Sequence, residues 1–425
     1  MTDTIYALSS GRPPAAISVI RISGPHAHAA SLQISGSLPE TRSAAVRELR
    51  HPASGELLDE ALILRFDAPA SSTGEDIVEL HCHGGRAVVA AVLAALRSLK
   101  GLREAQPGEF TRRAFENGRI DLTEAEGLAD LIEAETESQR KAALALADGG
   151  LRNQIASWQE QVLAFSAMAE RAIDYDDDDA PIDPTLQRDC AALSAELGEW
   201  LERPRIEVLK DGVRVVVAGP PNAGKSSIIN AIAGEERAIV TDIPGTTRDH
   251  IEVPLSLGGV PIRLTDTAGL RETEDVVEAI GVERAERLTE LADVLVWMGE
   301  GSAAPPHDRL VHVYAKADLR DAETVPVGSI PVSAVTGTGL PELLKAIEAS
   351  ARLVLPAEDR VAINRRQAEH LGEARVALHA AAECENWVLI AEELRYARNS
   401  FDRLTGRAGV DEMLDALFGR FCLGK

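Results

Sequence analysis

Residues 213–226 read VRVVVAGPPNAGKS, and this stretch decides the fold of one domain. Its apolar first half is typical of a buried strand, residues 219–226 have the spacing GxxxxGK[ST], and residues 226–234 (SSIINAIAG) read as a helix. Glycines let such a loop curl so that its backbone N–H groups face phosphate oxygens, and the helix N-terminus adds partial positive charge. Lys225 is then expected to bridge the β- and γ-phosphates, and the Ser226 hydroxyl to bind Mg²⁺. The stretch therefore predicts a site for a nucleoside triphosphate.

Two motifs further along the chain suit the triphosphate end of that site. Asp266 opens the sequence DTAG after a strand-like run at residues 261–265, so its carboxylate can reach the Mg²⁺ shell, and the Gly269 backbone can donate to the γ-phosphate. Residues 245–249 (GTTRD) offer a threonine that can complete the Mg²⁺ shell and leave it after hydrolysis. Together these motifs predict hydrolysis coupled to a conformational switch.

Two later motifs favour guanine over adenine. Asp318, in the sequence AKAD after another strand-like run, can accept two N–H bonds from the guanine edge, which adenine cannot offer. Ser333 and Ala334 follow the last strand-like run and can supply a backbone donor to the guanine carbonyl. Ala315 stands where this motif usually has Asn, so we expect guanine preference to survive and one loop-bracing hydrogen bond to be lost. Motifs in this order at strand ends predict GTP as the substrate.

Leu270 follows DTAG, where Ras-like proteins have the Gln that aligns the attacking water. A leucine side chain cannot align water, and no arginine of the chain stands out as a substitute. We therefore expect another group to orient the water and to neutralise charge.

The pattern of apolar residues changes along the sequence and predicts a multidomain fold. Residues 1–117 mix strand-like runs with turns, as in an α+β domain, and residues 212–350 alternate short apolar runs with helices, as in an α/β domain with a mostly parallel sheet. Residues 118–211 and 351–425 read as one helical domain that the α/β domain interrupts. Three- and four-residue apolar spacing predicts long helices at residues 122–147, 151–173 and 185–209, and again from 351 to 398.

Composition excludes several classes of protein. The 425 residues carry 44 Lys and Arg against 68 Asp and Glu, a net charge of −24, so a general nucleic-acid coat is excluded. The 4 cysteines are far apart without CxxC spacing, which argues against a disulfide framework or zinc ribbon and fits a reducing cytosol. There is no signal-like N-terminus and no apolar run long enough for a bilayer, so we expect a cytoplasmic protein without a membrane segment.

The motifs together resemble the MnmE (TrmE) family of tRNA-modification GTPases, over the whole chain. Its most specific segments are residues 73–76 (TGED), 83–85 (HGG), 107–115 (PGEFTRRAF), 245–249 (GTTRD) and 421–425 (FCLGK). The resemblance implies an α+β N-terminal domain that binds folate and dimerises, a helical domain, and an inserted Ras-like α/β P-loop G domain.

The same resemblance implies a partner and a reaction. A homodimer would join an MnmG-like FAD protein in a heterotetramer and add a carboxymethylaminomethyl or aminomethyl group to C5 of the wobble uridine, position 34, of certain tRNAs. The carbon would come from a tetrahydrofolate derivative, 5-formyl- or 5,10-methylene-tetrahydrofolate. K⁺ would take the place of an arginine finger in GTP hydrolysis.

Residue by residue, the resemblance completes the GTP site. Glu278 matches the family's water-orienting glutamate, which makes it a catalytic candidate with Lys225. Ser226 and Thr247 match Mg²⁺ ligands, and the potassium-binding positions are matched by Asn222, Thr241, Ile243 and Thr246. The residues expected around the nucleotide and its ions are Asn222, Ala223, Gly224, Lys225, Ser226, Ser227, Thr241, Asp242, Ile243, Pro244, Gly245, Thr246, Thr247, Asp266, Thr267, Ala268, Gly269, Lys316, Asp318, Ser333 and Ala334.

The resemblance also implies a folate site, at Arg21, Glu79, Arg119 and Lys425. A carboxylate such as Glu79 can accept the paired donors of a pterin ring, and cations suit the glutamate tail of folate. Arg119 stands where the family more often has Lys, which keeps the charge and changes the geometry. Without the resemblance, each of these residues reads as an ordinary surface charge.

Three questions stay open at this point. Cys422 can be a nucleophile that adds to C6 of uracil and activates C5, or a small buried hydrophobe. A set of arginines near the C-terminus can form solvated helix faces or a tRNA or partner contact: Arg365, Arg366, Arg395, Arg398, Arg403 and Arg407. The rival to a modification enzyme is a purely regulatory GTPase switch, which would have no use for folate residues or a cysteine-containing tail.

Overall fold

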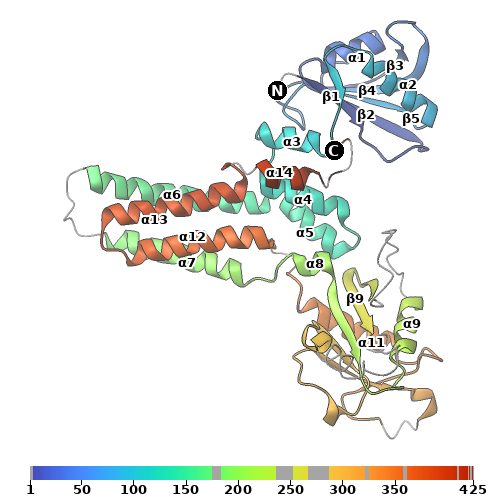
Figure 1. Cartoon of the computed structure of the whole chain (residues 1–425), viewed down its shortest axis with the longest axis vertical. Helices are drawn as coiled ribbons and strands as arrows, with labels where there is room; N and C mark the ends of the chain where they lie inside the picture. The colour runs from blue at the N-terminus through green and yellow to red at the C-terminus, as the bar shows by residue number, and fades with distance from the viewer. Residues whose placement is uncertain are drawn as a thin grey trace, which may run out of the picture. The chain divides into compact units, whose positions relative to one another are not determined.

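The computed structural model describes residues 3–174, 183–235, 252–266, 287–320, 325–357, 361–408, 411–419, 421 and 424. The chain divides into two compact units, one of residues 1–129 and 402–425 and one of residues 130–401. Figure 1 shows the sheet of the first unit and the helices and second sheet of the other. Among the described helices, none is both long and apolar enough to cross a membrane.

The first unit is built on a six-stranded sheet in the order β3-β4-β5-β2-β1-β6. Neighbouring strands are antiparallel except β1 and β6, which are parallel. The strands are β1 (Thr4–Leu8), β2 (Ile17–Ser23), β3 (Ala44–Arg50), β4 (Leu57–Phe66), β5 (Ile77–His83) and β6 (Leu102–Glu104). The period-two alternation of β5 gives it one face for the core and one polar face.

The two faces of this sheet are covered differently. Helices α1 (Ala27–Ser35) and α2 (Arg86–Arg97) pack on one face, around core residues such as Ile20 and Leu80. On the other face, Phe110 of α3 (Glu109–Glu116) packs with Ile5 and Ala7. Apolar side chains farther along this second face stay exposed, namely Ile17, Val46 and Leu62. The remaining helices are α4 (Leu122–Glu133), which continues into the second unit, and α14 (Asp411–Phe418).

The helical part of the second unit confirms the predicted helices and corrects their lengths. Its helices are α5 (Glu137–Ala147), α6 (Gly150–Asp174), α7 (Pro184–Glu202), α8 (Glu207–Asp211), α12 (Arg365–Glu383) and α13 (Trp387–Thr405). Trp158 is fully buried and stacks on Phe401, and its Nε1 donates to Glu196 Oε1 at 2.8 Å.

The predictions of unbroken helices at 122–147, 185–209 and 351–398 were wrong. The first breaks between α4 and α5, because Thr136 and Gln139 form a capping box that starts a new helix. The second breaks at Arg203, which has the extended backbone that a following proline, Pro204, favours. The third gives way to a turn after Arg352 and is interrupted again at residues 384–386, which have no regular structure.

The α/β part confirms the predicted, mostly parallel sheet. The strand order is β12-β11-β10-β7-β9-β8, and only the β8–β9 pair is antiparallel. The strands are β7 (Val213–Ala218), β8 (Glu252–Leu257), β9 (Val260–Asp266), β10 (Val294–Trp297), β11 (Leu310–Ala315) and β12 (Ile330–Val332). Helices α9 (Lys225–Glu235) and α11 (Leu340–Arg352) and the 3₁₀ turns η2 (Gly301–Ala303) and η3 (Ala317–Leu319) complete the described elements.

Candidate functional site

The carboxyl ends of the parallel strands bring the predicted GTP motifs to one edge of the second sheet. The phosphate loop follows β7, Asp266 ends β9, Lys316 and Asp318 follow β11, and Ser333 follows β12. Ligands of open α/β sheets bind at this edge. The topology therefore gathers motifs that lie far apart in the sequence.

The phosphate loop has the backbone that its sequence predicts. Gly219 and Gly224 have φ values of 149° and 97°, which strain a side-chain-bearing residue. Asn222 also has a positive φ, 59°, in the left-handed region that Asn tolerates better than most residues. A Cβ on Gly219 would lie within 3.1 Å of Met298, so the loop also needs this glycine for close packing.

Lys225 lies inside the curl of the loop. The residue is buried, and its Nζ donates to the carbonyl oxygens of Gly219 at 3.0 Å and Pro220 at 2.9 Å. A buried ammonium needs such oxygen partners. Phosphate oxygens are acceptors of the same kind with more negative charge, so this position suits the predicted contact with the β- and γ-phosphates.

Ser226 and Asp266 lie at hydrogen-bond distance. The Ser226 hydroxyl donates to Asp266 Oδ2 at 2.6 Å, and Asp266 is almost fully buried at the end of β9. Both are oxygen ligands of the kind that Mg²⁺ prefers. The predicted Mg²⁺ residues on these two elements therefore fit the ion.

The guanine motifs flank the same loop. Lys316 has a positive φ of 58°, and its Nζ donates to Asn222 O at 2.8 Å, so it lies across the phosphate loop. Asp318 is exposed on η3. Ser333 is buried, and its Oγ accepts from the backbone N–H groups of Val335 and Thr336. Ala334, beside it, is half-buried.

Several predicted residues lie outside the described part of the chain. They are the potassium-loop residues Thr241, Asp242, Ile243, Pro244, Gly245 and Thr246, the Mg²⁺ residue Thr247, residues Thr267, Ala268 and Gly269, the catalytic candidate Glu278, and Cys422 and Lys425 of the tail.

In the first unit, Arg21 and Glu79 form an ion pair on the partly open face of the sheet. They are directly opposite each other on β2 and β5, and Arg21 Nη2 lies 2.8 Å from Glu79 Oε1. The Arg21 guanidinium also lies 5.6 Å from the Phe110 ring centroid. His81, on the same face two residues along β5, approaches the other oxygen, with Nε2 at 3.2 Å from Glu79 Oε2. Both carboxylate oxygens of Glu79 are thus engaged.

His81 was not among the residues predicted for this surface. The alternation of β5 could have shown that His81 shares the face of Glu79, whereas Cys82 is buried in the core on the other face. Burial, with the nearby Asp59 carboxylate, raises the pKa of Cys82 to about 12. The thiol is therefore a core group and not a metal ligand of this strand.

Arg119 lies apart from this ion pair, beside the loop that leads into β5. A Cβ on Gly74 would come within 3.3 Å of the Arg119 side chain. The residue is exposed, so its head can reach a ligand at the sheet surface.

The end of the chain returns to the same sheet. Phe421 is buried, and its ring centroid lies 6.2 Å from that of Phe418. A Cβ on Gly424 would collide with Leu8 O, so the tail backbone lies against the end of β1. The neighbouring β1 residue, Ala7, is directly opposite Arg21. Gly424 therefore lies beside Leu8, the residue that follows the one opposite Arg21.

Two of the segments that carry the family resemblance meet in a buried charge network. Arg113 is fully buried and pairs with Glu75 at 3.1 Å, Glu109 at 3.1 Å and Asp3 at 3.0 Å. Burial alone would raise the pKa of Glu109, but hydrogen bonds from Arg103, the Gln106 backbone and Arg113 hold it below its usual value. These ion pairs fix the loop that contains Glu75 to helix α3. Their role is therefore structural and not that of a ligand site.

Family models and curated relatives cover this chain from end to end. The model described as "MnmE helical domain" matches residues 122–422, and "GTP-binding protein TrmE N-terminus" matches residues 4–119. The relative named "tRNA modification GTPase MnmE" from Rhizorhabdus wittichii is 52% identical over 100% of this chain and 97% of its own length. Its counterpart from Erythrobacter litoralis is 50% identical over 100% of both chains.

Likeness to solved structures is weaker. The G domain of the T. maritima FeoB iron transporter is 25% identical over 33% of this chain and 98% of its own, with a TM-score of 0.24.

Proposed function

The chain belongs to the MnmE family of tRNA modification GTPases, and we propose that its GTP hydrolysis is activated by potassium and supports a folate-dependent modification of the wobble uridine. The family assignment establishes a GTP hydrolase that acts in tRNA modification. The finer proposal is that a carboxymethylaminomethyl or aminomethyl group is added at C5 of uridine 34 in certain tRNAs, in the cytoplasm.

The observation that carries hydrolysis is the phosphate loop with Lys225 inside it. On GTP binding, Lys225 exchanges loop carbonyls for phosphate oxygens, and the backbone N–H groups that precede α9 face the phosphates. Bound Mg²⁺ neutralises phosphate charge, and Ser226 and Asp266 are its candidate ligands.

Potassium activation is proposed because Leu270 has no amide to align water and no arginine of the chain stands out as a finger. Asn222, exposed in the phosphate loop, is the described member of the proposed potassium site, and residues 241–246 supply the rest. Glu278 would orient the attacking water.

The folate proposal is supported by the Arg21–Glu79 pair. Its carboxylate is oriented by Arg21 and His81, and a flat ring can lie on the neighbouring surface, where Leu64 is directly opposite Glu79. Gly424 of the tail lies against Leu8 at the end of β1, which supports a folate contact by the tail residues that the resemblance implies. A purely regulatory switch would not need such a surface.

The partners belong to the same proposal. The exposed apolar residues Ile17, Val46 and Leu62 on the partly open sheet face support a homodimer through the N-terminal domains. An MnmG-like FAD protein would join this dimer in a heterotetramer that acts on tRNA. In the helical part, Arg365 and Arg395 already pair with Glu369 and Glu392, so these arginines suit a solvated helix face better than a tRNA contact.

The test is mass spectrometry of wobble nucleosides in tRNA from cells that lack this chain. Loss of the C5 modification, restored by the wild-type chain and not by Glu79→Gln, supports the proposal. An unchanged wobble nucleoside in the deletion strain would reject it.

A further inference from the structure

Helix α8 joins the helical part of the second unit to the phosphate loop. It ends at Asp211, Gly212 turns with a φ of 78°, and β7 then runs directly into residues 219–226. Helix α8 is therefore separated from the loop that holds Lys225 only by Gly212 and the single strand β7.

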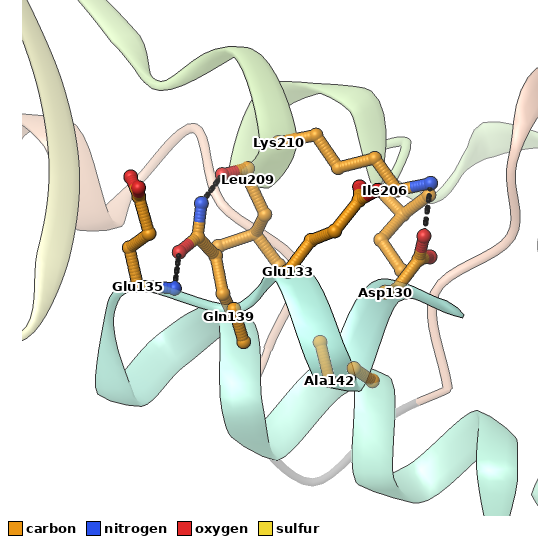
Figure 2. Close-up of a pocket in the computed structure, with 10 residues that line it drawn as sticks. Asp130, Glu133, Glu135, Gln139, Ala142, Ile206, Leu209 and Lys210 are labelled. Carbon is orange, nitrogen blue, oxygen red and sulfur yellow. Dashed lines mark hydrogen bonds and ion pairs between the residues drawn. The ribbon is translucent and has the colours of Figure 1, made fainter. Parts of the chain in front are cut away.

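Two side chains fasten α8 to the α4–α5 corner (Figure 2). Lys210 Nζ lies 2.6 Å from Asp130 Oδ1, whose side chain is only 10% exposed. Gln139 Nε2 donates to Leu209 O at 2.8 Å. They line a cavity of about 120 Å³ between the corner and α8, so these two polar contacts act beside the buried apolar residues Ile206 and Leu209.

Gln139 performs two tasks with one amide group. Its Oε1 accepts from the backbone N–H groups of Glu135 and Thr136, at 2.8 and 2.9 Å, which caps the first turn of α5. Its Nε2 is the donor to α8. The start of α5 and the end of α8 are thus fixed to each other by a single planar group.

The return of the chain is tied to the same helix. Ile206 N donates to Ile363 O at 3.2 Å, and Arg365 N donates to Glu207 Oε1 at 2.7 Å. Glu207 Oε2 is buried without a hydrogen-bond partner, an arrangement that costs free energy. Both passages of the chain between the α/β part and the helical part therefore meet at α8.

A second series of contacts connects the nucleotide site to α5 through the β8–β9 hairpin. At one end of β9, Asp266 accepts from Ser226. At the other end, the Gly259 carbonyl accepts from Ser138 N at 3.1 Å. Gly259 has a φ of 82°, and a Cβ there would lie 3.2 Å from Glu137, so hairpin and helix are in close contact.

We propose that the first turn of α5, through Ser138 and Gln139, is a coupling element that transmits the state of the nucleotide site to the helical part of the chain. Ser138 contacts the turn of the β8–β9 hairpin, whose strand β9 ends at the candidate Mg²⁺ ligand Asp266. Gln139 contacts α8, the helix that precedes β7 and the phosphate loop. A displacement of the hairpin and a displacement of α8 would both act on this one helical turn, and the Asp130–Lys210 pair holds α8 against the α4–α5 corner.

The sharpest variant is Gln139→Glu. A glutamate keeps both acceptors of the helix cap and loses only the donor to Leu209 O, so α5 stays capped while its link to α8 is lost. The second variant set is Asp130→Lys, Lys210→Asp and the double exchange. Arg188→Asp, at a 73% exposed position on α7, is the matched charge reversal.

The measurement is the distance distribution between spin labels at the exposed positions Val327 and Val376, in the full chain with GDP and with a non-hydrolysable GTP analogue. We expect a nucleotide-dependent shift in the wild type and in Arg188→Asp. We expect less than half of that shift in Gln139→Glu and in each single reversal, with GTP hydrolysis within about twofold of wild type. The double exchange re-forms the ion pair with reversed polarity and should restore the shift.

No nucleotide-dependent shift in the wild type, a full shift in Gln139→Glu, or a double exchange that fails to restore it would each overturn the coupling element. This inference deepens the proposed function, and the two fail separately. If the shift depends on Gln139 but the wobble nucleoside does not depend on this chain, coupling stands and the proposed modification does not.

Discussion

The phosphate loop and the Arg21–Glu79 pair present their ligand groups in opposite ways. The loop is contiguous, and most of its donors are backbone N–H groups whose direction the glycines set. The Arg21–Glu79 pair joins strands 58 residues apart in the sequence, with Phe110 from α3 and the tail beside it. A site made of contiguous backbone can be read from residue spacing, whereas a site of side chains on separate strands depends on strand register.

The largest effect is expected at the phosphate loop, on the rate of GTP hydrolysis. Replacing NaCl by KCl at equal ionic strength should speed GTP hydrolysis by the full chain by about 10³-fold, because the proposed ion would do the work of an arginine finger, worth roughly 10³–10⁵-fold. The initial rate of phosphate release measures this. Asn222→Ala should reduce the ratio, and equal rates in the two salts would contradict the potassium site.

The stability of the first unit, which contains the Arg21–Glu79 pair, should instead depend on the buried charge of Arg113. Arg113→Met leaves Glu75 and Glu109 without their cation and should destabilise the first unit by about 3–5 kcal/mol. Hydrogen exchange of the β5 amides in the full chain measures this. Arg140→Met, which breaks an exposed pair with Glu137, should leave those amides unchanged.

The same network predicts a pH dependence. The pKa of Glu109 is lowered in the folded chain, so its contribution to stability is complete above the unfolded value of about 4.3 and is lost as the pH falls through the folded value. Protection of the β5 amides should therefore decline below about pH 4.3 in the wild type, and less steeply in Glu109→Gln. Equal slopes would contradict the ion pairing of Glu109.

Glu278→Ala should slow turnover by roughly 10²-fold and leave GTP affinity nearly unchanged, because a group that orients water acts in the transition state. Single-turnover hydrolysis and equilibrium binding of GTP separate the two effects. A loss of affinity equal to the loss of rate would make Glu278 a structural residue. The expected result would separate residues that bind the phosphates, such as Lys225, from a residue that orients the attacking water.

The sequence predicted the elements around the phosphate loop well, for a physical reason. Buried parallel strands such as β7 and β10 are continuous apolar runs, and their ends carry the motifs. Strand β3 was not predicted, because AAVRELR alternates only weakly and most of its residues are exposed. The break between α4 and α5 was also missed, although Thr136 and Gln139 form a capping box that the sequence contains.

The candidate sites divide in the same way. Lys225, Ser226 and Asp266 were each identified from spacing, and the structure brings them together. Arg21 and Glu79 were identified by resemblance, and only the strand register shows that they are directly opposite each other. His81 was not identified, although the alternation of β5 places it on the same face as Glu79.

Changes in the C-terminal tail should have the smallest effect. They should alter folate binding without altering GTP hydrolysis. Lys425→Ala, or removal of the last three residues, should weaken folate binding by about tenfold, as expected when one hydrogen bond to a charged group is lost. GTP hydrolysis by the same protein should be unchanged. Calorimetric titration with 5-formyl-tetrahydrofolate and a phosphate-release assay measure the two properties.

The size of this effect depends on whether the tail is held before the ligand arrives. Phe421 is buried beside Phe418, and Gly424 lies against Leu8 with a φ of 95°, so much of the ordering entropy is already lost in the free chain. Phe421→Ala should therefore weaken folate binding more than Lys425→Ala does, although Phe421 need not touch the ligand. If Phe421→Ala has no effect while Lys425→Ala does, the tail binds as a free arm and its packing against β1 plays no part in recognition.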